Sequence, residues 1–103
     1  MDRPIFYILA GHEPVPVTDT ELYGRWFEDS SNHLVQRTEL AGGIYVSTIF
    51  VGIDTGGHDE GPPILFETMV IGGTMDGTRS RYSTWKDAEL GHALILTQLI
   101  HEQ

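Results

Sequence analysis

The chain contains no cysteine, and this absence excludes several kinds of chemistry at once. Disulfides, thiolate zinc sites, iron–sulfur clusters and thiol nucleophiles all require cysteine, so covalent or metal chemistry must use oxygen or imidazole groups. No G-x-S-x-G, P-loop or G-x-G-x-x-G motif is present either. The glycine pairs at 42–43, 56–57 and 72–73 therefore indicate hairpin turns rather than phosphate-binding loops.

Basic residues are scarce. Six Lys and Arg against 15 Asp and Glu give a formal net charge of -9, and Lys86 is the single lysine. Affinity for nucleic acid depends on cations that replace counterions along the phosphate backbone, so we expect no direct nucleic-acid binding. The acidic surface favours a protein partner with a basic surface, or it serves solubility alone.

Long apolar runs are also absent. No stretch approaches the roughly 18 apolar residues of a membrane-spanning helix, and residues 1–4 lack the basic start and apolar stretch of a signal peptide. We therefore expect no membrane association and a cytoplasmic location. A length of 103 residues with 40% hydrophobic content predicts one domain over residues 1–103.

The apolar patterns that are present predict an α+β domain. We expect an opening strand at 5–9, an edge segment at 13–17, and a short helix that begins after Thr18 or Asp19. Strands near 33–40, 44–53, 64–71 and 79–82 follow, and a final helix begins after Ser83 or Thr84. The expected fold is a curved antiparallel sheet of four to five strands, with the C-terminal helix packed on one face and the shorter N-terminal helix nearby.

The strand at 44–53 is apolar at both alternating sets of positions. This pattern indicates a central strand that is covered on both faces, or one whose outer face meets another chain. Because only two helices are available to cover the sheet, we expect a homodimer that buries the remaining face.

Four blocks of the sequence carry a resemblance to known proteins. They are Val46 to Asp54, Gly61 to Val70, Arg81 to Trp85 and Ala88 to His92. With its G-P-P-x-L-F-E-T-M-V block, the chain resembles a family of small uncharacterised bacteriophage and prophage proteins from about Leu9 onward. The resemblance implies a phage gene expressed in the cytoplasm of a bacterial host. It brings no reaction, cofactor or catalytic residue.

Glu67 and His92 are the two residues that an apolar pattern does not explain. Glu67 interrupts an apolar strand, and a buried carboxylate loses solvation unless it is paired. It forms either a cross-strand ion pair with Arg79 or Arg81, or the acid or base of a cleft. His92 lies on the apolar stripe of the last helix, where it is either a hydrogen-bonded core residue or a catalytic partner of Glu67.

The polar segment from residue 54 to 63 is a candidate contact surface. It carries Asp54, His58, Asp59 and Glu60, and we expect these residues to bind a partner. The same groups can ligate a divalent cation, but their spacing matches neither an EF-hand nor a His-Glu-x-x-His motif. We predict no metal and no cofactor.

Three functional hypotheses follow. The first, favoured by size, charge and few catalytic signatures, is a phage accessory protein that binds and inhibits or redirects a host protein, such as a CRISPR effector or nuclease with a basic groove. The second is a small-molecule or nucleotide binder or hydrolase that uses Glu67 and His92 with Arg79 and Arg81. The third is a structural protein of the phage particle.

Overall fold

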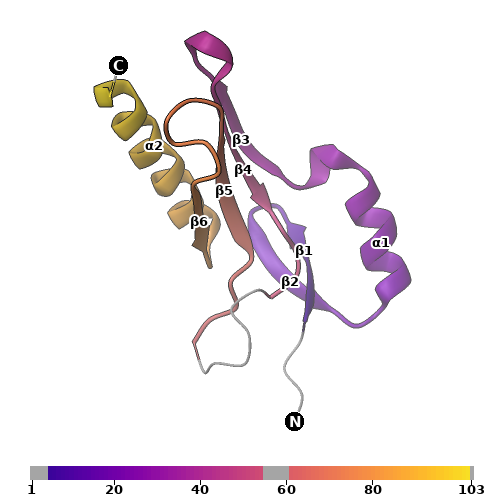
Figure 1. The fold of residues 1–103 in the computed structure, drawn as a ribbon. Coiled ribbons are helices and arrows are strands. Elements are labelled where there is room, and N and C mark those ends of the chain that lie inside the picture. Colours follow the sequence, from indigo (N-terminus) through magenta and orange to yellow (C-terminus); the bar gives the residue numbers. More distant parts are fainter. Residues whose placement is uncertain (1–4, 55–60, 103) are drawn as a thin grey trace.

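The computed structural model describes residues 5–54 and 61–102 and confirms an α+β fold (Figure 1). Within these ranges, two helices accompany six strands in two antiparallel sheets, one ordered β1-β2 and the other β3-β4-β5-β6. The elements are β1 (Phe6–Ala10), β2 (Glu13–Val17), α1 (Thr20–Glu28), β3 (Leu34–Glu39), β4 (Tyr45–Phe50), β5 (Phe66–Ile71), β6 (Arg79–Tyr82) and α2 (Trp85–Glu102). Short 3-10 turns occupy Ser30–Asn32 and Ala41–Gly43.

The four-stranded sheet is the antiparallel sheet that the sequence predicts. Each of its strands pairs antiparallel with the next one in the chain. The predicted strand at 44–53 is shorter than expected, because Gly52 adopts a φ of 76° that an extended strand does not have. The chain turns there against the rings of Tyr23 and Phe27, which lie 3.0 and 3.2 Å from the position of an added Cβ atom.

The segment Glu13–Val17 forms a hairpin with β1 and does not join the main sheet. Its prolines at 14 and 16 lack backbone N–H groups, which suits a two-stranded ribbon better than a sheet interior. The hairpin is attached to the chain after β4, where Phe6 bridges Ile53 and the Tyr7 N–H donates to the Gly52 carbonyl at 2.8 Å. The expected fifth strand therefore belongs to a second sheet.

Both helices begin at side chains that satisfy their first N–H groups. Asp19 caps α1 by accepting from the N–H groups of Glu21 and Leu22, and the Thr84 hydroxyl accepts from Asp87 at the start of α2. Neither helix in the described ranges combines the length and apolar character that crossing a bilayer requires.

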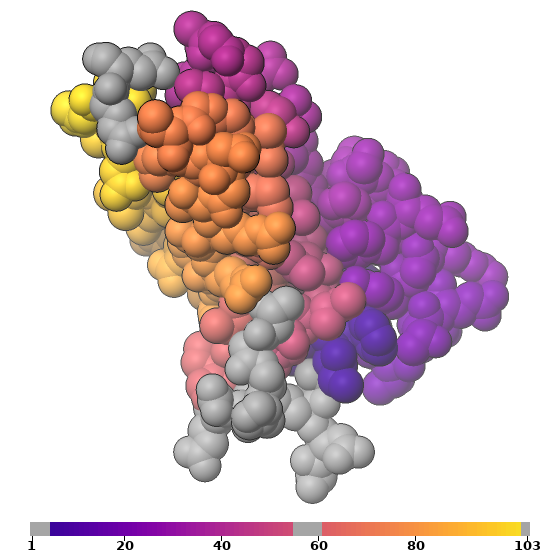
Figure 2. Space-filling model, viewed as in Figure 1, coloured from indigo at the N-terminus to yellow at the C-terminus, as the bar shows by residue number. Residues whose placement is uncertain are grey.

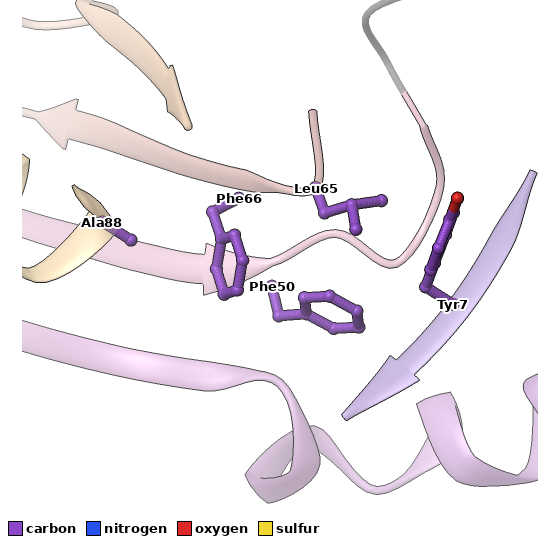
Figure 3. Close-up of a cluster of buried hydrophobic side chains, with 5 residues drawn as sticks. All are labelled: Tyr7, Phe50, Leu65, Phe66 and Ala88. Carbon is purple, nitrogen blue, oxygen red and sulfur yellow. The ribbon is translucent and has the colours of Figure 1, made fainter. Parts of the chain in front are cut away.

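The core lies between α2 and one face of the main sheet. One cluster joins the hairpin to the sheet and α2, and Figure 3 shows Phe50 and Phe66, whose rings meet edge to face, in its centre between Tyr7 and Ala88. A second cluster combines Val46 and Val70 with residues of α2. Among the described elements, α2 lies along the main sheet, whereas α1 packs against the β1-β2 hairpin and lies away from α2 (Figures 1 and 2).

Side chains alternate strictly between two environments along the central strands. On β4, Val46, Thr48 and Phe50 are fully buried, whereas the residues between them are partly exposed, and β5 follows the same rule. We call the side under α2 the covered face. The opposite side, which neither helix covers, is the open face.

Candidate functional site: the open face of the sheet

The open face combines apolar side chains in its centre with charged side chains along both edges. β4 and β5 supply a partly exposed centre of Tyr45, Ser47, Ile49, Glu67, Met69 and Ile71. β3 contributes Arg37 and Glu39, and β6 contributes Arg79 and Arg81. A trough of about 340 Å³ lies on this face, lined by Arg37, Tyr45, Ser47, Ile49, Glu67, Met69, Ile71 and Arg79.

Strand register arranges these side chains in cross-strand rows. One row runs Arg37–Ser47–Met69–Arg79, with one residue from each of the four strands. Neighbouring strands lie about 4.8 Å apart, so the two arginine backbones stand about 14 Å apart at opposite edges of the trough. The trough therefore crosses the sheet and has an arginine at each edge.

Glu67 lies where β5 meets β6 and contacts both arginines of the edge strand. Its carboxylate is 3.5 Å from Arg79 Nε and 3.9 Å from Arg81 Nε. The Glu67 side chain is 17% exposed and the two arginine side chains are about half exposed. The predicted cross-strand ion pair is present, and it explains why a carboxylate interrupts this strand.

The two arginines are only loosely held by Glu67. Both ion-pair distances exceed ordinary hydrogen-bond lengths, and Glu67 Oε1, although buried, has no hydrogen-bond partner among the described residues. The single carboxylate of Glu67 thus pairs with two guanidinium groups. Arg37, on the far edge, lies over the Tyr45 ring at 4.1 Å and 3.3 Å from Glu39.

His92 belongs to α2, and its fully buried side chain points to the covered face of the sheet. Its Nδ1 is 2.7 Å from the Thr48 hydroxyl and its Nε2 is 2.9 Å from the Thr38 hydroxyl. Thr48 in turn shares a 2.6 Å hydrogen bond with Thr68. Both ring nitrogens have partners, and burial lowers the pKa of His92 below its ordinary value of 6.5. His92 is therefore a hydrogen-bonded core residue.

The hypothesis of a Glu67–His92 catalytic pair is wrong in its geometry. Glu67 projects from the open face, while its neighbour Thr68 points to the covered face and joins the network of His92. The sheet itself separates the carboxylate from the imidazole. Arg79 and Arg81 stay beside Glu67, so a ligand site on this side contains the arginines without the histidine.

The predicted contact segment is only partly described. His58, Asp59 and Glu60 lie outside the described residues. Asp54 accepts a hydrogen bond from the Ile64 N–H at 3.1 Å, and its own N–H donates to the Ile5 carbonyl. This carboxylate therefore connects the segment that follows β4 to the segment that leads into β5. Within the described ranges, no three acidic or histidine side chains gather as metal ligands.

Sequence reasoning missed Arg37 and Tyr45 as members of the site. The signal that identifies them is the alternation of side chains between the two faces of a strand. Once β3 and β4 are paired through the turn at 41–43, Arg37 lies opposite Ser47, on the same face as Glu67. A bulge between Leu34 and Gln36 hides this pattern, because it changes which β3 residues face the same side.

Comparison of the chain with protein-family models, with curated proteins and with solved structures finds no match. The resemblance to phage and prophage proteins therefore stays a prediction.

Proposed function

We propose that the protein acts by binding a partner protein through the open face. The observation that carries this proposal is a sheet face with partly exposed Tyr45, Ile49, Met69 and Ile71 that no described helix covers. Tyrosine, methionine and arginine are enriched in protein interfaces, and the open face holds all three. If the resemblance to phage proteins holds, the partner is a host protein whose activity is blocked or redirected.

A second copy of the chain is a poorer occupant than a different protein. When two such faces stack about a twofold axis along the strands, β3 lies over β6 and Arg37 opposes Arg79. An axis across the strands brings each arginine edge against itself. Like charges that oppose each other cost free energy, so stacking that sets arginine against arginine is disfavoured in both arrangements.

The size of the face supports the same choice. Four strands about 4.8 Å apart, with up to six residues at about 3.3 Å each, give a surface of roughly 20 by 20 Å. Stable interfaces bury about 800 Å² of accessible surface on each partner, which is more than a patch of this size supplies. The open face therefore suits a small contact better than a permanent dimer, and the predicted homodimer becomes an outcome of the test.

The test places a photo-crosslinking amino acid at Ser47, in the centre of the open face, with Thr97 on the outer side of α2 as control position. Host lysate is irradiated, the captured protein is identified and purified, and its binding is reconstituted. The proposal expects capture at Ser47 and not at Thr97. It also expects Met69→Glu to weaken the reconstituted complex about 100-fold, because the variant replaces an apolar contact in the centre of the face with a charged group that must lose its solvation.

The matched control is Leu94→Glu, since Leu94 is an apolar residue on α2 that is already 66% exposed. Equal loss of binding for both variants contradicts the proposal. Capture of a second copy, with dimers by sedimentation that Met69→Glu dissociates, assigns the face to self-association and also overturns it. Thermal-shift screening with nucleotides tests the rival small-molecule function, which the arginines of the trough favour.

A further inference from the structure

Positive charge is concentrated on the open face of an otherwise acidic protein. Three of the six basic residues of the chain, Arg37, Arg79 and Arg81, project there. Glu39 and Glu67 are the acidic residues on the same face, and each already lies beside an arginine. The sequence suggests a basic partner because of its net charge, but the surface best suited to contact carries the opposite local charge.

The arginines retain capacity for a further anion. Each of the three side chains is about half exposed, and Arg79 and Arg81 share the single carboxylate of Glu67 at distances of 3.5 and 3.9 Å. A guanidinium group presents five N–H donors and binds a carboxylate through two of them. A carboxylate from a partner therefore finds free donors at the β6 edge, and a second one finds them at Arg37.

The spacing of the arginines sets the spacing of those carboxylates. The backbones of Arg37 and Arg79 stand about 14 Å apart across the trough, by three interstrand separations. In an extended segment, side chains four residues apart point the same way and lie about 13 Å apart, and the residue midway between them points to the same side. That middle residue falls over Ser47 and Met69.

We infer that the trough recognises an extended segment of an acidic partner, with two carboxylates four residues apart and an aliphatic residue midway between them. This inference rests on the proposed function and specifies its ligand. The segment crosses the strands, its carboxylates lie at Arg37 and Arg79, and its aliphatic side chain fills the trough against Met69. A trough of about 340 Å³ accommodates a few side chains rather than a helix about 10 Å wide.

The probe is a blocked heptapeptide, Ser-Glu-Thr-Val-Thr-Glu-Ser, titrated into labelled protein and followed by NMR. One matched peptide replaces both glutamates with glutamine, a second replaces them with lysine, and a third moves one glutamate so that the two are three residues apart. We expect shifts centred on Ser47 and Met69, and an affinity at least fivefold higher than for any matched peptide. Added salt weakens this preference, because exposed charges are screened within about 10 Å at 0.1 M.

Protein variants locate the charges. Arg37→Gln and Arg79→Gln are each expected to weaken the glutamate peptide about five- to tenfold, without effect on the glutamine peptide. Arg25→Gln is the control, since Arg25 is an exposed arginine on α1 that pairs with Glu21. Thermal unfolding of each variant verifies that the fold persists.

Four outcomes overturn the inference: no binding of the glutamate peptide, equal binding of the glutamine or shifted peptide, shifts that map away from the open face, or equal effects of Arg25→Gln and Arg79→Gln. ATP is titrated in parallel, and competition by ATP at tenfold higher affinity also overturns it in favour of a small-molecule site. The proposed function fails separately, when Met69→Glu leaves the complex with the captured protein unchanged.

Discussion

Replacing Thr48 with valine removes the hydroxyl at the centre of the buried network while keeping the shape of the side chain. That oxygen is 2.7 Å from His92 Nδ1 and 2.6 Å from the Thr68 hydroxyl, and all three side chains are fully buried. The substitution leaves one polar group on each neighbour without this partner. Each buried unsatisfied group costs about 1–3 kcal/mol, so with two such groups we expect the unfolding free energy to fall by about 2–6 kcal/mol.

The assay is urea unfolding followed by circular dichroism at pH 7.5. Thr97→Val is the control, because Thr97 is exposed on α2 and its substitution is expected to change stability by less than about 0.5 kcal/mol. Thr48→Ser keeps the oxygen and is expected to lose only about 1 kcal/mol for the missing methyl group. A loss below about 0.5 kcal/mol for Thr48→Val refutes the assignment of this network as a stabilising element.

Three further predictions concern titration, charge and backbone conformation. Because burial lowers the pKa of His92, its contribution to stability is complete above pH 6.5 and is lost as pH falls from 6.5 toward the folded value; an NMR titration midpoint at or above 6.5 contradicts this. Glu67→Gln is expected to cost about 0.5–1 kcal/mol, since its arginine partners are half exposed, and a double-mutant cycle with Arg79 that shows no coupling excludes the ion pair. Gly52→Ala is expected to lower the unfolding free energy by about 1–3 kcal/mol in urea, because Gly52 has a φ of 76° and an added Cβ atom would lie 3.0 Å from Tyr23. Gly24 lies in α1 with open space around it, so Gly24→Ala is expected to stabilise the fold by about 0.5–1 kcal/mol. Equal effects of the two glycine substitutions contradict this account.

Local sequence signals predicted the strands and helices because each depends on nearby residues. The glycine turn at 41–43 sets the β3–β4 pairing, and Thr84 with Asp87 marks the start of α2. At Gly91 the Tyr82 side chain occupies the space where a Cβ atom would stand. In the turn and at the helix start, the residues that determine the local structure are neighbours in the sequence.

The site was harder to predict because it depends on which face each side chain meets. Glu67 and His92 come from elements that pack together, so sequence spacing alone leaves open whether they meet. The alternation of side chains along β5 shows that they do not meet. Thr48 and Thr68 lie on the side of His92, and Glu67, as the neighbour of Thr68, points to the opposite face. The β3 bulge hid Arg37, and the separate pairing of β1 with β2 depends on contacts with the chain beyond β4.

The central claim is that the open face binds a partner protein. The most direct measurement is the dissociation constant for the protein captured at Ser47, compared between wild type, Met69→Glu and Leu94→Glu. The account predicts about 100-fold weaker binding for Met69→Glu and no change for Leu94→Glu. Unchanged binding for Met69→Glu, with the fold intact, contradicts the claim.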